Sequence, residues 1–220
     1  MESLKFYFDT LCPWCYQTSR WARRLEQLGE IELDWGVFSL GIVNAPEGQD
    51  PHAVESQSAP ALRTAMVIRD TYGSRRIGQF YAALGELVWE TVPPAPQDEA
   101  TVKRALVAAG FDPGLCDQAL QDPATWDAVI AEHQSLVDTF QGFGVPTLVL
   151  DGGTGPAIFG PAISDLPDDQ KSVELWHHLL WLVRYDNFWE LKRARPRPPR
   201  LPALEWRALQ GQEVTLARQG

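Results

Sequence analysis

Residues 4–15 read LKFYFDTLCPWC, and this stretch decides the fold. Its first five residues are apolar or aromatic apart from one lysine, which is typical of a short buried strand. Pro13 suits the first position of a helix, because a proline has no N–H that would be left unpaired there. Large side chains then recur every three or four residues as far as Leu28, which predicts an amphipathic helix. The pair Cys12 and Cys15 therefore lies where a strand passes into a helix.

The rest of the chain alternates strand and helix signals. Residues 31–40 have strand character, so the chain opens with a β-α-β unit. Residues 48–142 contain mainly helical patterns, punctuated by prolines and by Asp-Pro pairs that start helices. Two short apolar runs at 148–150 and 157–159 predict a β-hairpin, and a final amphipathic helix follows at 173–183.

The composition excludes several classes of protein. Of the 220 residues, 45% are hydrophobic and 22% are charged, which is the balance of a globular domain. A net charge of -10 argues against a nucleic-acid binder, which would be basic. The chain shows no run of about 18 apolar residues and no secretory signal, so we expect no membrane span and a cytoplasmic location. Three cysteines are too few for a disulfide scaffold.

The two cysteines of the motif are suited to redox chemistry. At the start of a helix, unpaired N–H groups and the helix dipole stabilise a thiolate, so we expect the pKa of Cys12 to fall from about 8.5 into the range of about 3.5 to 7.5. Cys15, one turn inside, is expected to be more buried and protonated, within reach of a disulfide bond. Cys12 would attack a substrate and Cys15 would resolve the mixed disulfide, while Pro13 and Trp14 would adjust the reduction potential.

A zinc half-site is the alternative use of the pair. Structural zinc normally takes four ligands, often from two such cysteine pairs. The third cysteine, Cys116, lies far along the chain, and the four histidines are scattered. We therefore expect no metal, and we expect no flavin. We interpret Cys116 as a buried or semi-exposed helix residue.

Three titratable residues outside the motif have two interpretations each. Asp9, just before the motif, is expected to accept hydrogen bonds in a turn, with a role as a base toward either cysteine as the alternative. His133 and His177 both fall on apolar helix faces. We expect both to be core histidines, with a proton shuttle as the alternative.

Val145-Pro146-Thr147 precedes the predicted hairpin. The proline is either a plain turn residue or the cis-proline of a loop that faces the attacking sulfur, as in a thioredoxin-like fold. Such a proline has no N–H, and the backbone of Val145 is then free to hydrogen-bond an extended substrate. The position after a helical region and before a hairpin favours the second interpretation, with Val145 and Pro146 as substrate-binding residues.

Several stretches of the chain share one family likeness: 6–15 (FYFDTLCPWC), Thr18-Ser19-Arg20-Trp21, Ser39-Leu40 with Asn44, Val145-Pro146-Thr147, Phe159-Gly160-Pro161, and Phe188 with Glu190-Leu191-Lys192-Arg193. Together they resemble the DsbA-like branch of the thioredoxin superfamily and, within it, the mycothiol-dependent nitroreductase family of actinobacteria. The resemblance covers most of the chain to about Arg195. The combination of the cysteine motif with the following Thr-Ser-Arg-Trp and the late Glu-Leu-Lys-Arg is its most specific part.

The resemblance implies a cytosolic reductase that draws electrons from a low-molecular-weight thiol, with nitro-aromatic reduction as an adventitious activity. The thiol would be mycothiol, or bacillithiol or glutathione in an organism that makes one of these instead. By the resemblance, Cys12 is the attacking cysteine and Cys15 the resolving one, and Trp14 and Asn44 line the substrate pocket. The sequence departs from the family at Val88-Trp89-Glu90, where a histidine is expected, and in the loop after Asn44, where the family's tyrosine has no clear match.

These observations predict a thioredoxin-like α/β fold with a mixed central sheet and an all-helical, DsbA-like insertion. Residues 1–47 and 143–195 would form the thioredoxin-like domain, 48–142 the helical insertion, and 196–220 a Pro/Arg-rich tail. The expected function is that of a thiol-disulfide oxidoreductase. Its substrates would be small thiols, small disulfides or electrophiles, with protein disulfides as a further option, and it would be a monomer or a homodimer.

Two other functions stay open. A DsbA-like isomerase of the glutathione-transferase-kappa type usually has serine in place of the first cysteine, so Cys12 counts against it. A redox-gated interaction module or chaperone would use the disulfide to control partner binding without turnover. Catalysis that is lost in Cys12→Ser would support the oxidoreductase, and oxidation-dependent capture of a partner without catalysis would support the module.

Overall fold

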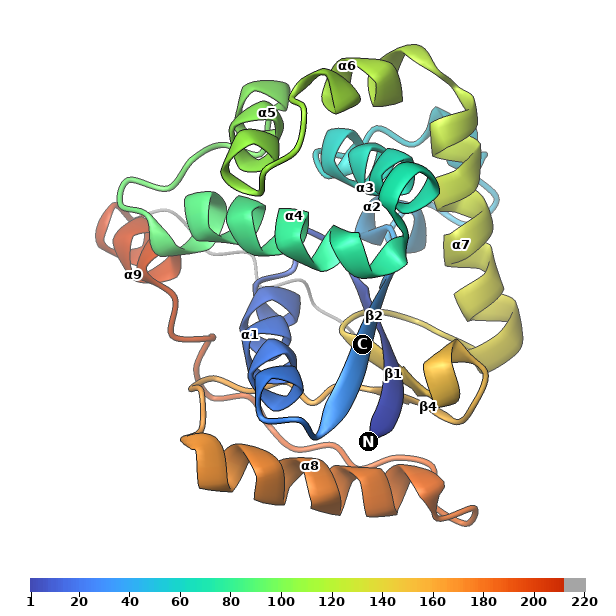
Figure 1. Ribbon diagram of the computed structural model, residues 1–220, viewed down its shortest axis with the longest axis vertical. Coiled ribbons are helices and arrows are strands. Elements are labelled where there is room, and N and C mark those ends of the chain that lie inside the picture. Colours follow the sequence, from blue (N-terminus) through green and yellow to red (C-terminus); the bar gives the residue numbers. More distant parts are fainter. Residues whose placement is uncertain (212–220) are drawn as a thin grey trace.

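A β-α-β unit places the two cysteines of the motif at the junction of a strand and a helix. In the computed structural model, which describes residues 1–211, the chain opens with strand β1 (Glu2–Phe8), helix α1 (Pro13–Gln27) and strand β2 (Ile31–Val37) (Figure 1). The two strands are parallel, and Phe6 on β1 pairs with Trp35 on β2. The β-α-β opening predicted from the sequence is confirmed.

Four strands form one mixed sheet in the order β2-β1-β3-β4. Strands β3 (Thr147–Leu150) and β4 (Ala157–Phe159) form the predicted hairpin around the short 3-10 turn η4 (Asp151–Gly153). β3 is antiparallel to both β1 and β4. Because β1 lies inside the sheet, Leu4, Phe6 and Phe8 are completely buried. The mixed central sheet is therefore confirmed.

The second strand ends earlier than the sequence predicts. The strand expected over residues 31–40 stops at Val37, and a short helix, α2 (Leu40–Val43), follows. The cause is a local capping bond, since the Ser39 hydroxyl accepts a hydrogen bond from the N–H of Ile42 at 3.2 Å. Serine at the start of a helix satisfies an N–H that would otherwise be unpaired, and here this bond turns the chain out of the sheet.

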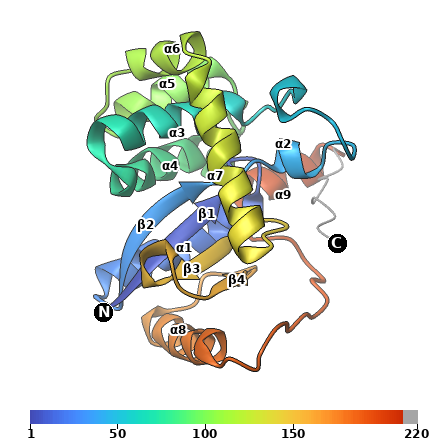
Figure 2. The same ribbon diagram turned by 90° about the vertical axis from the view of Figure 1, so that its right-hand side faces the viewer.

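The chain between β2 and β3 consists of helices and loops. After α2 these elements are η1 (Pro51–Ala53), α3 (Ala59–Tyr72), η2 (Ser74–Arg76), α4 (Ile77–Gly85), the π-helix η3 (Glu86–Glu90), α5 (Glu99–Ala108), α6 (Gly114–Gln121) and α7 (Ala124–Phe140). Figure 2 shows α3 to α6 gathered beyond one end of the strands, with α7 returning along the sheet. The exact limits of an insertion at residues 48 and 142 stay a prediction.

The helical segment meets α1 through close aromatic contacts. The ring of Tyr81 on α4 stacks on Phe8 with centroids 3.9 Å apart, and it meets the ring of Tyr16 edge-on at 6.1 Å. Gly85 makes this approach possible, because a Cβ atom at its position would overlap the Tyr16 ring. The Tyr16 hydroxyl in turn donates a hydrogen bond to the carboxylate of Glu90. α1 is thus packed and hydrogen-bonded to α4 and η3.

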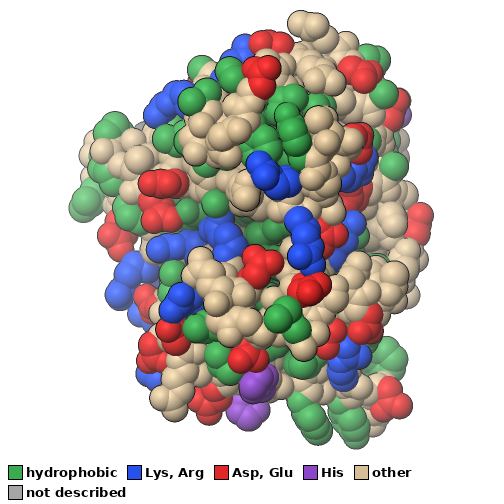
Figure 3. Space-filling model, in the orientation of Figure 1, with side chains coloured by type: hydrophobic (Ala, Val, Ile, Leu, Met, Phe, Trp, Pro, Cys, Tyr) green, Lys and Arg blue, Asp and Glu red, His purple; other side chains and the backbone are tan. Residues whose placement is uncertain are grey.

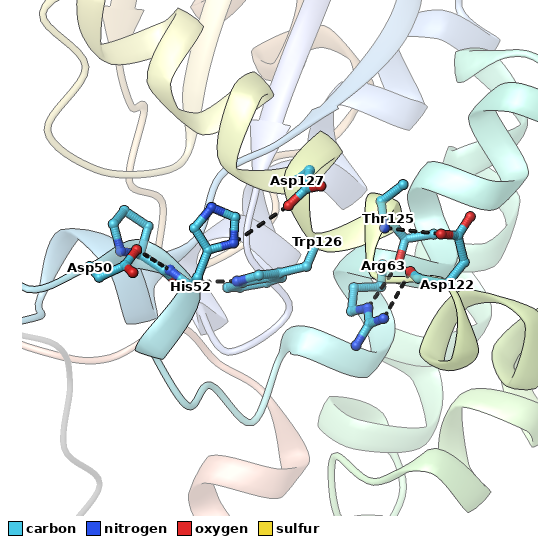
Figure 4. A network of polar contacts seen from close by, with 9 residues as sticks. Asp50, His52, Arg63, Asp122, Thr125, Trp126 and Asp127 are labelled. Carbon is cyan, nitrogen blue, oxygen red and sulfur yellow. Dashed lines mark hydrogen bonds and ion pairs between the residues drawn. The ribbon is translucent and has the colours of Figure 1, made fainter.

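The loop after α2 is tied to the start of α7 (Figure 4). The indole N–H of Trp126 donates to the carbonyl of Pro51 at 3.2 Å. His52 Nδ1 lies 3.4 Å from Asp127 Oδ1. Beside them, Arg63 of α3 donates from Nε to the Thr125 hydroxyl at 2.8 Å. These bonds hold the loop and α3 against one helix.

Helix α8 (Asp169–Arg184) packs against α1. The rings of Trp21 and Trp176 meet edge-on at 6.3 Å and are both buried. The prediction of a core position for His177 is wrong, since its side chain is 59% exposed and its Nε2 lies 3.0 Å from Glu30 Oε2. His177 directly follows the buried Trp176, but its own side chain lies at the surface, outside the contact between α8 and α1. His133 on α7, by contrast, is buried as predicted.

Residues 185–211, called here the C-terminal arm, run back across the molecule from α8 to helix α9 (Pro202–Leu209). The N–H of Arg200 donates to the carbonyl of Ser164 at 2.7 Å. Leu201, Ala203 and Leu204 are buried, and α9 packs on the π-helix η3. The described part of the predicted tail is therefore docked on the fold, while residues 212–220 of that prediction lie outside the described residues.

One end of α8 carries exposed aromatic side chains. Trp181 and Tyr185 stack with centroids 5.4 Å apart, and Trp189 is 85% exposed. Hydrophobic side chains protrude at this edge of the molecule in Figure 3. Whether the protein is a monomer or a homodimer stays a prediction. Among the helices of residues 1–211, no candidate has the length and hydropathy of a membrane span.

Candidate active site

Cys12 and Cys15 begin helix α1 as the sequence predicts. Cys12 is the N-cap residue, Pro13 holds the first helical position, and the N–H of Cys15 donates to the sulfur of Cys12 at 3.2 Å. Both cysteines are free thiols. Such a bond satisfies one of the unpaired N–H groups of the helix start, and it becomes stronger when the sulfur carries a negative charge. The arrangement is suited to a nucleophilic thiolate at Cys12.

Asp9 organises the turn that leads from β1 into this helix. Its Oδ1 accepts from the N–H of Leu11 at 2.9 Å, and its Oδ2 accepts from the N–H of Leu40 at 2.7 Å and from the Ser58 hydroxyl at 3.1 Å. Asp9 therefore acts as a hydrogen-bond acceptor in this turn. Burial raises the pKa of this carboxyl to about 6, against the opposing effect of the three hydrogen bonds.

The Cys15 thiol is held in its protonated form. The residue is completely buried, and this burial raises the pKa of its thiol well above the ordinary value. The hydrogen bond and the charge of Cys12 act in the same direction, as does the charge of Asp9. The sequence-based expectation of a buried, protonated second cysteine agrees with this environment.

The loop before β3 faces the first cysteine. The Val145–Pro146 peptide bond is cis, and the Cys12 thiol donates to the carbonyl oxygen of Val145 at 3.5 Å. The Thr147 hydroxyl donates to the carbonyl of Gly144 at 2.7 Å and fixes the loop from the other side. Of the two interpretations of Val145-Pro146, the cis-proline loop beside the sulfur is the one present. A role of these residues in binding substrate stays a prediction.

Cys12 and Trp14 are covered by segments that are distant in sequence. Cys12 is 3% exposed and Trp14 is 6% exposed. The guanidinium of Arg195, on the C-terminal arm, lies 5.4 Å from the Trp14 ring centre. The side-chain amide of Gln97, on the loop after η3, donates to the carbonyl of Thr10 at 3.1 Å. The side chains of Cys12 and Trp14 are therefore almost completely covered.

Asn44 is placed differently from the other predicted site residues. It ends α2, and its side-chain amide donates to the carbonyl of Leu40 at 2.8 Å. Its side chain is exposed and bonded to its own helix. α2 is tied to the motif through the bond between Leu40 and Asp9, so Asn44 is near the end of β1 in the fold. The assignment of Asn44 to a substrate pocket stays a prediction.

Sequence reasoning missed the contributions of Tyr81, Gln97 and Arg195 to this site. Tyr81 is part of an apolar helical stripe, a pattern typical of core residues, and nothing in the pattern marks its hydroxyl. Gln97 and Arg195 lie in proline-rich segments whose path across the fold has no local signal. The cysteine motif alone therefore identifies the two sulfur atoms but not the residues that cover them.

His133 and Cys116 lie outside the cysteine motif and are both buried. His133 accepts at Nδ1 from the N–H of Ser39 at 3.3 Å, and burial lowers the pKa of its ring to about 4. Cys116 lies in helix α6 and is buried, which is one of the two environments predicted for it, and burial raises the pKa of its thiol. Within residues 1–211, no group of three or more His, Cys, Asp or Glu side chains is arranged to hold a metal ion.

Comparison with known proteins gives the chain a family. The family model described as "Rv2466c-like: Mycothiol-dependent nitroreductase Rv2466c" matches residues 11–193. A Mycobacterium tuberculosis (strain ATCC 25618 / H37Rv) protein, named uncharacterized protein Rv2286c, is 36% identical over 199 residues, which cover 89% of this chain and 83% of that protein. The matched region contains the whole cysteine motif and ends shortly before the C-terminal arm crosses Trp14.

Solved structures share the fold. The cytosolic disulfide reductase DsbM from Pseudomonas aeruginosa with GSH has a TM-score of 0.58 at 15% identity, covering 82% of this chain and 100% of that chain. The probable DsbA oxidoreductase SCO1869 from Streptomyces coelicolor has a TM-score of 0.57 at 16% identity, covering 89% and 95%. The predicted DsbA-like thioredoxin fold is thus confirmed. With the family match extending over most of its length, this chain belongs to the Rv2466c-like mycothiol-dependent nitroreductase family and is a thiol-disulfide oxidoreductase.

Proposed function

We propose that this protein is a cytosolic reductase in which Cys12 and Cys15 pass electrons from a low-molecular-weight thiol to a small disulfide or electrophile. Mycothiol is the first candidate, because the family bears its name, and bacillithiol and glutathione are the alternatives. The observation that carries the proposal is the position of the Cys12 sulfur, which lies 3.2 Å from the N–H of Cys15 and 3.5 Å from the carbonyl of Val145.

The thiol chemistry follows from this position. The Cys12 thiolate attacks one sulfur of a disulfide R–S–S–R, forms the Cys12–S–S–R bond and releases R–S⁻, which takes up a proton. Cys15 then gives up its proton, its sulfur attacks that of Cys12, and the second R–S⁻ leaves. The substrate is reduced to two thiols and the cysteine pair is oxidised to a disulfide. Two molecules of the low-molecular-weight thiol restore the dithiol and leave as their own disulfide.

The burial of the pair favours small substrates. A sulfur on a residue that is 3% exposed is reached more easily by a small disulfide than by one on a folded protein. Pro13, Trp14, Val145 and Pro146 would surround the small molecule, with Asn44 contributing from α2. Protein disulfides are therefore the less favoured of the two predicted substrate classes.

A turnover assay with purified full-length protein tests the proposal. We expect reduction of a small dialkyl disulfide in the presence of mycothiol, at a rate well above that of insulin reduction. Cys12→Ser and Cys15→Ser should both lose turnover, and Cys116→Ser should keep it as the matched control. The proposal would be contradicted if Cys12→Ser turned over at the wild-type rate, or if the wild type reduced insulin faster than the small disulfide. Replacing mycothiol by bacillithiol or glutathione identifies the thiol.

A second candidate function is the redox-gated interaction module. The exposed stack of Trp181 and Tyr185 favours it, because contiguous exposed aromatic side chains often mark interaction surfaces. Wild-type protein that shows no turnover with any of the three thiols, yet captures a partner only when oxidised, would establish this function instead.

A further inference from the structure

Tyr81 places a buried hydroxyl group beside the cysteine pair. The residue is 1% exposed, and its ring is held by the residues that flank the motif on both sides. It stacks on Phe8, at the end of β1, with centroids 3.9 Å apart, and it meets Tyr16, the residue after Cys15, edge-on at 6.1 Å. The ring position is therefore fixed relative to the Cys12–Cys15 segment.

The hydroxyl itself lacks a hydrogen-bond partner in the described part of the chain. A buried hydroxyl without a partner destabilises the fold, and phenylalanine would fill the same space without that cost. The titratable groups whose charges act on it are Cys15, Cys12 and Tyr16, together with Arg23 of α1. Burial, followed by the charges of the two cysteines, raises the pKa of Tyr81, whereas Arg23 lowers it. The group is therefore a neutral O–H donor that has no hydrogen bond to either sulfur in the structure and whose ring packs on the residues before and after the motif.

The reaction needs such a donor at the second cysteine. To resolve a mixed disulfide, Cys15 must lose its proton in a completely buried position, where a negative charge is poorly solvated. A backbone hydrogen bond from Asp9 favours the Cys15 thiolate, but the charge of the Asp9 carboxylate opposes it, and that carboxylate only accepts hydrogen bonds. The N–H of Cys15 is directed to Cys12. Among the buried side-chain groups without a partner in residues 1–211, which include the Thr10 hydroxyl, the Tyr81 hydroxyl is one that interacts with the charges of both cysteines.

We propose that Tyr81 donates a hydrogen bond to the Cys15 sulfur as its negative charge develops, and so accelerates resolution of the mixed disulfide at Cys12. The inference rests on the proposed function, since it assigns one step of the same thiol exchange. In that step Cys15–SH and Cys12–S–S–R give Cys12–S–S–Cys15 and R–SH, so the proton of Cys15 leaves with the thiol product. Tyr81 keeps its own proton throughout.

The test separates the two steps with an aryl disulfide whose released thiolate is coloured, dithiobis-nitrobenzoate. Mixed in stopped flow with the reduced full-length protein, it should release one thiolate when Cys12 attacks and a second when Cys15 resolves. Tyr81→Phe should keep the first phase, slow the second about tenfold, and raise the midpoint of the pH profile of the second phase by about one pH unit. Tyr16→Phe, whose hydroxyl bonds Glu90 instead, is the matched control and should keep both phases.

The outcomes distinguish the inference from the function on which it rests. An unchanged second phase in Tyr81→Phe, with two normal phases in the wild type, overturns the inference alone. Equal slowing of both phases together with a lower Tm also overturns it, because it indicates a purely structural role. A wild type that shows no first phase, or a first phase that persists in Cys12→Ser, overturns the proposed function. We expect the Tm of Tyr81→Phe to be unchanged or higher, since a buried polar group without a partner is removed.

Discussion

The sulfur of Cys12 lies 3.5 Å from the carbonyl oxygen of Val145, a residue 133 positions further along the chain. This contact joins the start of α1 to the loop that opens β3. The long helical segment lies between β2 and β3 in the sequence. It does not separate the two parts of the site, because β1 pairs directly with β3. The Cys12 sulfur is thereby enclosed by the sheet, by helix α1 and by the C-terminal arm, which crosses Trp14 at Arg195.

Removing the arginine over Trp14 should make Cys12 more accessible. Arg195→Ala eliminates the guanidinium 5.4 Å from the indole centre, a type of contact that contributes about 0.5–1 kcal/mol. In a Cys15→Ser background, we therefore expect Cys12 to be alkylated by iodoacetamide about two to five times faster. Arg193→Ala changes an exposed arginine of the same arm and should leave the rate unchanged. Equal rates in the two variants would show that the arm does not restrict access to Cys12.

Asp9 and His133 should change stability in opposite directions between about pH 4 and pH 6. Burial raises the pKa of Asp9 from 3.8 to about 6, so in this window the folded state binds a proton that the unfolded state has lost, and the free energy of unfolding falls as pH rises. Burial lowers the pKa of His133 from 6.5 to about 4, so the unfolded state binds the extra proton and the free energy of unfolding rises. The effects are on the order of 2 to 3 kcal/mol each, and wild-type stability should vary little.

Two asparagine variants separate these contributions. His133→Asn retains an acceptor for the N–H of Ser39 but does not titrate, so its free energy of unfolding should fall from pH 4 to pH 6. Asp9→Asn leaves only the histidine effect, so its free energy of unfolding should rise over the same range. Urea unfolding at a series of pH values measures both. Parallel curves for the wild type and the two variants would refute the assignment.

The hydrogen bond between Tyr16 and Glu90 should stabilise the contact between α1 and the π-helix. Glu90→Ala removes the acceptor of the Tyr16 hydroxyl and an ion pair with Arg20 at 3.5 Å, so we expect a loss of about 1–2 kcal/mol in the free energy of unfolding. Glu86→Ala, an exposed position on the same π-helix, should change it by less than about 0.5 kcal/mol. Chemical denaturation compares them, and equal losses would rule out a specific role for Glu90.

The fold was accessible to sequence reasoning because its signals are local. The apolar run before the motif, Pro13 at the first helical position and the apolar period after Trp14 each depend on neighbouring residues, and together they predict the β-α-β unit. The hairpin follows from two short apolar runs. The early end of β2 was missed because the capping bond of Ser39 competes with an apolar pattern that continues to Leu40.

The site could be predicted from the sequence only in part, because only some of its signals are local. Cys12, Cys15 and Pro146 could be identified because their residue types and order carry the chemistry. The cover formed by Gln97 and Arg195 depends on how distant segments dock, and no local pattern encodes that. His177 shows the limit of helical periodicity, since it lies beside the buried Trp176 and yet pairs with Glu30 at the surface.

Intact-mass spectrometry of the Cys15→Ser protein after incubation with the disulfide of mycothiol tests the central claim most directly. Attack by Cys12 without a resolving partner should leave one mycothiol attached to the protein, reversible by a reducing agent and mapped to Cys12. The Cys12→Ser protein, treated in parallel, should gain no mass. An unmodified Cys15→Ser protein, with bacillithiol and glutathione disulfides equally inert, would contradict the account, as would an adduct of the same yield on Cys12→Ser.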